Sequence, residues 1–532
     1  MNSLKHRSIS LILLALTISV FLASCKKDFG DINKSWDNKV YTATIPALYN
    51  GITASMADAP VILYSCWIYQ NTQLAAMYAA GGFRLDNFTA NAWNNYYRAL
   101  ANYRKLEEMI DTDANAANMT NVKGMAKVLM AYKTLKLTLM YGDMPYTEAG
   151  KGFVSADFFR PKYDSQESVI KGALAELKWA IDNLTVSSTQ VTLASAEVIF
   201  ANDIPKWIKL ANSLRLRYAM VLLEKAPADA ATIIAEALAK PLLEPGEYFG
   251  MYPSSIPGFL NNRLIGGNAG YVSMGSTMWN SMSSSNEKDG SGIFDLRCKI
   301  FFEPNAFGEW VPFPQVPNNN TPTEVGNEGV NAPYSEGRLT AYYPAGASWR
   351  YSPLNFYYLD DKTFPQVFIS GSEVSFLKAE IYNRGLGGVS ANPATAKSNY
   401  ESGVLESVKF WFKTANGSAI WAVNKPAAAP TAQELTAMMS NPQIAFKTDA
   451  AAALKQIYQQ HWIELFHQPL EAWTLARRTN YATPSVTLLT TSPGYNFFSL
   501  TYPQSEIDGN FDNWTSITGG SDTPTKKPWF MK

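Results

Sequence analysis

The chain has 532 residues, of which 47% are hydrophobic and 17% charged, and its 45 basic side chains balance its 45 acidic ones. This is the composition of a globular protein, and a balanced charge gives no electrostatic reason to expect nucleic acid as a partner. Only three histidines are present, His6, His461 and His467, which argues against a His-rich metal site. We therefore expect neither a nucleic-acid-binding protein nor a zinc hydrolase.

The first residues carry the pattern of an export signal. Lys5 and Arg7 precede an apolar run over about 9–22. A run this short does not comfortably cross a hydrocarbon core of about 30 Å as a helix, so it indicates a signal peptide and not an anchor. The run leads into Leu-Ala-Ser-Cys at 22–25, where a cysteine stands in place of an Ala-x-Ala cleavage site. This tetrad resembles a bacterial lipobox, which implies cleavage before Cys25 and acylation of that residue.

The signal predicts a division of the chain into three segments. We expect a lipoprotein signal peptide over 1–24, a lipidated tether over 25–41 and a folded domain over 42–532. Two or three acyl chains on Cys25 would anchor the protein stably, where a single chain would not. The alternative is an ordinary signal peptide with an accidental cysteine.

Helical periodicity dominates the folded segment up to about residue 240. The clearest helix is predicted over 164–184, where Asp164 and Glu167 make a capping-box-like start and apolar residues repeat on one face. Pro205 suits the first turn of another helix. Further helices are predicted over about 93–110, over 121–141 with Gly142 as the helix-ending residue, and over 371–384, about 393–414 and about 449–482.

Successive helices of similar length joined by short loops predict stacked helical hairpins, as in a tetratricopeptide-like solenoid. We expect this mainly helical scaffold over about 42–240 and 365–485. The standard tetratricopeptide consensus is absent, so the prediction rests on the lengths and spacing of the helices.

Residues 241–364 differ in composition, because Gly, Pro, Asn and Ser become frequent there. A long loop-rich insert on a helical scaffold is a common place for a ligand surface. The candidate ligand-binding residues are Trp279, Trp310 and Trp349 in this insert, with Tyr78, Arg84 and Trp93 from the loop near 79–92. Their rings could stack on the apolar faces of sugars or on peptide side chains, or they could pack the loops onto the scaffold.

Several short strings support one family resemblance when they are taken together and in order. They are residues 141–149 (YGDMPYTEA), 160–164 (RPKYD), 206–208 (KWI), 211–217 (ANSLRLR), 373–380 (EVSFLKAE), 462–466 (WIELF), 471–473 (EAW) with 477–479 (RRT), and 502–506 (YPQSE) before Asn510. With the lipobox, they make the chain resemble the SusD/RagB family of Bacteroidetes outer-membrane lipoproteins, in particular its SusD-like second subfamily.

The resemblance implies a single SusD-like domain over 42–532, with tetratricopeptide-like helical pairs and a ligand face made by loops. It implies a non-catalytic protein of the outer membrane that faces the cell exterior and covers a SusC-like TonB-dependent transporter. Such proteins capture oligosaccharides, and in some members peptides, and pass them to the barrel. Lys26-Lys27-Asp28 after the lipidated cysteine is less acidic than the export signal common in these bacteria.

The shared strings are expected to be structural. Asp143 is predicted to cap a helix, and Arg215 or Arg217 to pair with a carboxylate such as Glu373 or Glu380. The double arginine at 477–478 is expected to pair between helices in the same way.

The sequence also leaves open a metal site, two other functions and the state of two cysteines. Asp289 and Asp295 flank a Gly-Ser-Gly turn that could hold calcium, although the spacing does not match an EF-hand and a polar turn is the simpler interpretation. A surface glycoside hydrolase would need two flanking carboxylates, for which Asp289, Asp295 and Glu309 are candidates. A protein-binding scaffold is the third possibility. Cys66 and Cys298 could pair or remain free thiols.

Overall fold

The structure is a computed structural model, and its chain divides into two compact units, Met1–Thr44 and Ile45–Lys532. The residues described are 43–57, 68–77, 90–252, 272–305, 307–315, 351–355, 365–419, 421, 425–479 and 498–531. The lipidation candidate Cys25, and also Cys66, Tyr78, Arg84 and Trp349, lie outside them.

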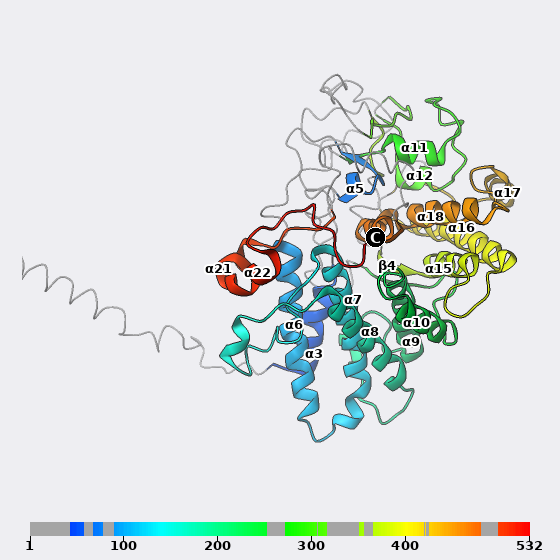
Figure 1. Ribbon diagram of the computed structural model, residues 1–532. Helices are drawn as coiled ribbons and strands as arrows, with labels where there is room; N and C mark the ends of the chain where they lie inside the picture. Colours follow the sequence, from blue (N-terminus) through cyan, green and yellow to red (C-terminus); the bar gives the residue numbers. More distant parts are fainter. Residues whose placement is uncertain are drawn as a thin grey trace, which may run out of the picture. The chain divides into compact units, whose positions relative to one another are not determined.

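Helices form most of the regular structure in these residues (Figure 1). The α-helices are α3 (Ile45–Ala54), α5 (Ile68–Asn71), α6 (Ala90–Asp111), α7 (Thr120–Tyr141), α8 (Gln166–Asn183), α9 (Ile204–Ala219), α10 (Pro227–Leu238), α11 (Ser276–Met282), α12 (Cys298–Phe301), α15 (Gly371–Arg384), α16 (Pro393–Asn416), α17 (Ala432–Ser440), α18 (Ala450–Glu464), α19 (Pro469–Thr479), α21 (Gln504–Gly509) and α22 (Phe511–Thr518). The short 3-10 helices are η1 (Ala116–Met119), η2 (Ala156–Phe159), η3 (Ala194–Ala196) and η6 (Leu465–His467). The strands are β1 (Ala76–Met77), β2 (Tyr248–Met251), β3 (Val272–Ser273) and β4 (Gln366–Ser370).

The helices pack as consecutive pairs. In one run, α6, α7, α8, α9 and α10 each contact the next helix, and in a second run α15 packs against both α16 and α18. Contacts between α9 and α15 join the two runs. This arrangement confirms the predicted scaffold of stacked helical hairpins.

Helix α8 shows why the pairs form, because the apolar residues of its predicted face are buried against α7 and α9. Its start differs from the prediction by one residue. Ser165 is the N-cap, and its hydroxyl accepts a hydrogen bond from the Ser168 amide at 3.3 Å. Asp164 instead accepts hydrogen bonds from the amides of Tyr146 and Thr147, both at 2.9 Å. The carboxylate therefore fixes the preceding loop and not the helix.

The helical stretch predicted over about 449–482 consists of two helices in the described residues, which reach Thr479. Helix α18 ends at Glu464, the turn η6 follows, and α19 begins at Pro469. Proline cannot donate the helical hydrogen bond and disfavours helical dihedrals in the residue before it, and Gln468 has φ −127° and ψ 58°. The break lets α18 and α19 contact different helices.

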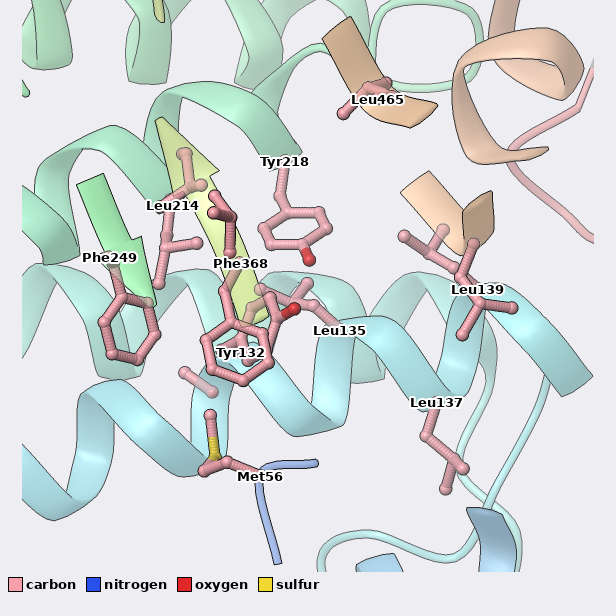
Figure 2. Close-up of a cluster of buried hydrophobic side chains, with 14 of the residues drawn as sticks. Met56, Tyr132, Leu135, Leu137, Leu139, Leu214, Tyr218, Phe249, Phe368 and Leu465 are labelled. Atoms are coloured by element: carbon pink, nitrogen blue, oxygen red, sulfur yellow. The ribbon is translucent and has the colours of Figure 1, made fainter. Parts of the chain in front are cut away.

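The core of the scaffold is aromatic where α7 meets the two-stranded sheet of β2 and β4. Figure 2 shows Tyr132 of α7 beside the rings of Phe249 and Phe368, which come from the strands. The ring centroid of Tyr132 lies 5.4 Å from that of Phe368 and 6.4 Å from that of Phe249. Leu214 and Tyr218 of α9 close this cluster. Rings in such edge-to-face contact contribute packing energy beyond the area they bury.

Buried ion pairs join helices that are distant in sequence. Arg217 Nε donates to Glu373 Oε1 at 2.6 Å, and Arg478 Nη2 donates to Glu380 Oε2 at 2.7 Å. Burial by itself would raise the pKa of each glutamate, but the neighbouring arginine lowers it to about 2 in both. These contacts confirm the predicted pairing of Arg217, whereas Arg215 pairs with Glu236. Arg477 behaves differently, because its guanidinium stacks on Trp473 at 3.6 Å.

Candidate functional site

The loop-rich region is built on a small framework of strand pairings. Ala76 of β1 pairs with Ser273 of β3, and Ser273 also bridges to Pro353. Gly275 bridges to Phe313 in the same region. Segments from four distant parts of the sequence therefore meet at one place.

Side chains reinforce this framework. Ala76, Phe313 and Tyr351 form a small buried cluster, in which the two rings lie 4.7 Å apart, edge to face. Helices α5 and α11 lie beside it (Figure 1), and the Thr277 hydroxyl of α11 donates a hydrogen bond of 3.0 Å to the amide oxygen of Gln73, two residues after the end of α5. Met77, which precedes the candidate Tyr78 in the sequence, and Tyr351, two residues after the candidate Trp349, both belong to this framework.

The structure brings Trp279 and Trp310 together as a stacked pair. Their ring centroids are 6.3 Å apart and their planes differ by 15°. The indole nitrogen of Trp279 donates to Asn286 at 3.1 Å, and the backbone amide of Trp310 donates to the Lys288 carbonyl at 2.7 Å. Only 1% of Trp279 and 8% of Trp310 is exposed. In this arrangement the pair holds the loop over 283–292 in place.

That loop includes the turn considered as a calcium site. Asp289 accepts a hydrogen bond from the Ser291 amide at 2.8 Å, as in an ordinary polar turn. Asp295 is fully buried and bound to Arg297, with a distance of 2.7 Å between Oδ2 and Nη2. The two carboxylates therefore have different partners. Within the described ranges, no group of three or more histidine, cysteine or acidic side chains is arranged to hold a metal ion.

Each of the three carboxylates considered for glycoside hydrolysis has a partner of its own. Glu309 forms a partly exposed ion pair with Lys288 at 3.1 Å, whereas Asp295 is engaged by Arg297 and Asp289 by its own turn. Hydrolysis by a pair of carboxylates needs both groups on opposite sides of one bond. Asp295 is fully buried in this arrangement and cannot reach such a bond.

Trp93 belongs to a separate aromatic cluster in the scaffold, and only 2% of it is exposed. Its ring lies 5.0 Å from Tyr97, 5.1 Å from Tyr141 and 5.5 Å from Tyr502. The indole nitrogen donates to Glu506 at 3.0 Å. A packing role accounts for this position, and the structure does not bring Trp93 together with Trp279 and Trp310.

Residues from several of the shared sequence strings contact one another in this cluster. Tyr163 donates to Glu506 Oε2 at 2.7 Å, and Tyr502 donates to the Asp143 carbonyl at 2.7 Å. The Asp143 carboxylate accepts a hydrogen bond from the Gln166 amide at 2.8 Å, which confirms its predicted role at the start of a helix. The strings therefore fix the C-terminal segment to the scaffold. Nothing in their sequence spacing indicated that they surround Trp93.

Cys298 is a buried free thiol, which is one of the two states that the sequence left open, and burial raises its pKa well above the ordinary range. One further feature was not apparent from the sequence. A hollow of about 280 Å³ opens beside β2, with Tyr248 and Tyr252 in its lining. In the part of the chain that is described, no helix has the length and apolar character needed to cross a membrane.

Comparison with known proteins gives matches over nearly the whole chain. The family model described as "Starch-binding associating with outer membrane" matches residues 37–492. No curated protein matches the sequence.

Solved structures share the fold. A chitin-binding protein superposes with a TM-score of 0.69 at 22% identity, covering 92% of this chain and 100% of its own. A SusD-like protein from Bacteroidetes AC2a gives 0.70 at 21% identity, with the same coverage of both chains. A chitin-binding SusD homologue from Flavobacterium johnsoniae gives 0.60 at 21% identity, covering 91% of this chain and 98% of its own. These superpositions show that the chain shares a fold of tetratricopeptide-like helical pairs with the three proteins.

Proposed function

The chain belongs to the SusD-like family of starch-binding proteins associated with the outer membrane, and from this we propose that it is a non-catalytic nutrient-binding protein of the cell surface. Its ligand is an oligosaccharide, which it delivers to a SusC-like TonB-dependent transporter. The observation that carries the proposal is the family match over residues 37–492. Two proteins with the same fold are described as chitin-binding, which supports the choice of a glycan over a peptide.

The proposed position is the outer membrane, with the protein facing the cell exterior. Cys25 and its lipobox supply the anchor, since two or three acyl chains on one residue hold a protein at a bilayer surface without a membrane-spanning helix. The tether over 25–41 would then keep the domain beside its transporter.

We place the proposed ligand surface in the loop-rich region, which includes the framework of β1 and β3. Tyr78, Arg84 and Trp349 remain predictions for direct ligand contact. Trp279 and Trp310 contribute as the stacked pair that fixes the loop over 283–292.

Native gel electrophoresis with soluble polysaccharides embedded in the gel tests the proposal. The detergent-solubilised lipoprotein should be retarded by starch or glycol chitin, and unrelated proteins of the same charge should not. Retardation by neither polysaccharide, combined with binding of a mixed peptide library, would replace the glycan with a peptide. Release of shortened sugars from either polysaccharide would contradict a non-catalytic role.

A further inference from the structure

The hollow beside β2 is separate from the framework of β1 and β3. Strand β2 forms one wall, and the loop over 197–200 forms the other. Ile199, Phe200, Leu243 and Met251 give the lining an apolar part, whereas Tyr248, Tyr252, Lys206 and Glu247 give it polar groups. The lining therefore combines an apolar surface with several hydrogen-bonding groups, as small-molecule sites usually do.

The wall on β2 is shaped by a bulge. The pairing of β2 with β4 shifts register between Phe249 and Gly250. A Cβ atom at Gly250 would lie 2.8 Å from the Gln366 carbonyl oxygen, so the bulge requires glycine there. Bulges bend a strand and redirect its side chains.

Two tyrosines flank this glycine in the sequence. The hydroxyl groups of Tyr248 and Tyr252 are hydrogen-bonded to each other, and both residues line the hollow. Gly250 lies between them in the sequence and also lines the hollow.

The opposite wall is a loop held in a strained conformation. Ala194, Ala201 and Asn202 all have positive φ values, of 48°, 52° and 63°, which are unusual outside glycine. The buried carboxylate of Glu197 organises the loop, because it accepts hydrogen bonds from the amides of Ile199 at 2.7 Å and Phe200 at 3.1 Å. Backbone strain of this kind concentrates at functional sites and persists only where the surroundings enforce it.

The charged residues around the hollow indicate the charge of the ligand that it could bind. Lys206 and Glu247 bring opposite charges, and each has a protein partner, Asp203 at 3.3 Å and Lys209 at 2.9 Å. The hollow therefore has no unbalanced charge to attract an ion. Its chemistry suits a neutral molecule with one apolar face and several hydroxyl groups.

A pyranose ring has these properties, because its C–H groups form an apolar face and its hydroxyls lie around the rim. We propose that the hollow beside β2 is a second sugar-binding site, which takes one or two units of a neutral oligosaccharide. This inference rests on the proposed function for the class of ligand, but it concerns a surface separate from the loop-rich region. Phe200 and Met251 would contact the ring, and Tyr252 would bind a hydroxyl.

The test uses calorimetric titration of the detergent-solubilised lipoprotein with maltose and with N,N′-diacetylchitobiose. Val198 lines the hollow and is 40% exposed, so Val198→Trp can fill the space without disturbing the core. Val186 is 77% exposed and is not part of the lining, which makes Val186→Trp the matched control. Wild type and Val186→Trp should bind two equivalents of sugar, and Val198→Trp should bind one.

A second variant keeps the test valid if Val198→Trp does not fold. Tyr252→Phe removes one hydroxyl and should weaken the second binding event about 3- to 10-fold, as expected for one lost hydrogen bond. Equal stoichiometry and affinity in wild type, Val198→Trp and Tyr252→Phe would overturn the second site while leaving glycan binding intact. Loss of all binding in Val198→Trp would support the hollow and overturn the loop-rich region as the ligand surface. Absence of sugar binding in wild type would overturn both.

Discussion

Arg217 of α9 and Glu373 of α15 form an ion pair that is almost completely shielded from solvent, with 2.6 Å between Nε and Oε1. The same guanidinium donates to the Phe368 carbonyl of β4 at 2.7 Å and to Gln468 at 3.2 Å. One arginine thus connects the two runs of helices with the strand and the turn between α18 and α19. The contact explains why the sequence strings around these residues are structural and not part of the ligand surface.

Arg217→Met should destabilise the protein by about 3–5 kcal/mol, because it leaves the Glu373 carboxylate buried without its main partner. Urea unfolding followed by circular dichroism measures the change. Affinity for glycan should be unaltered, since the pair lies in the scaffold. Lys171→Met is the control, because Lys171 pairs with Glu167 and Asp229 at the exposed surface and its loss should destabilise the protein far less. Equal destabilisation by the two variants would contradict the structural role of Arg217.

Acid should destabilise the protein through the two buried glutamates. Burial raises the pKa of Glu373 and Glu380, but Arg217 and Arg478 lower it to about 2, from an unfolded-state value near 4.5. The folded state therefore binds these protons less tightly, so the stabilisation is complete above about pH 4.5 and is lost as the pH falls toward 2. Melting temperatures measured between pH 2 and 5 should fall with acid, and a flat profile would contradict the pairing.

Glu464 should have the opposite effect in a separate pH range. Its burial raises the pKa to about 6, although hydrogen bonds from Ser407 and Ser370 and the charge of Arg297 act against the rise. The folded state binds this proton more tightly than the unfolded state, so stability increases as the pH falls from 7 to about 4.5. Glu464→Gln should remove that part of the pH dependence, which thermal melts at pH 5 and pH 7 would detect. A variant that keeps the wild-type difference between the two melts would count against this assignment.

Much of the scaffold could be predicted because its signals are local. Helix α15 has the predicted bounds, since the Ser370 hydroxyl caps its start and Gly385, with φ 69°, ends it. The break between α18 and α19 was missed, although Pro469 was a visible signal for it.

Less of the candidate site could be predicted from the sequence, because its contacts form only in the folded chain. Trp279 and Trp310 were both identified as loop aromatics, but their stacking depends on the loop that lies between them in sequence. The hollow beside β2 depends on a bulge at Gly250 and on left-handed residues such as Ala201. The presence of Ala201 or Gly250 in the sequence does not reveal the tertiary contacts that impose the backbone conformation of that residue.

The stacked tryptophans make a further prediction about the loop-rich region. Trp310→Ala should cost about 3–5 kcal/mol, the usual range for removing a buried tryptophan, and should release the loop over 283–292. Trp349→Ala should instead lower glycan affinity at least tenfold without changing the melting temperature. Calorimetry and thermal melts on the two variants separate these effects, and unchanged affinity in Trp349→Ala would remove it from the ligand surface.

The anchor can be tested independently of the ligand. Cys25→Ala should prevent acylation, so the protein should leave the membrane fraction and lose its lipid mass in intact-protein mass spectrometry. The variant should retain the wild-type melting temperature, since the lipid plays no part in the folded domain. Retention of Cys25→Ala in the membrane fraction would contradict anchoring through this residue.

Non-catalytic capture of a glycan is tested most directly by a titration in which the ligand is recovered afterwards. Maltoheptaose and chitohexaose are titrated into the solubilised lipoprotein in a calorimeter, and the sugar is then separated by chain length. We predict saturable binding of at least one sugar, and the recovered ligand should be unchanged in length after prolonged incubation. Recovery of shorter sugars, or no binding of either ligand at millimolar concentration, would contradict it.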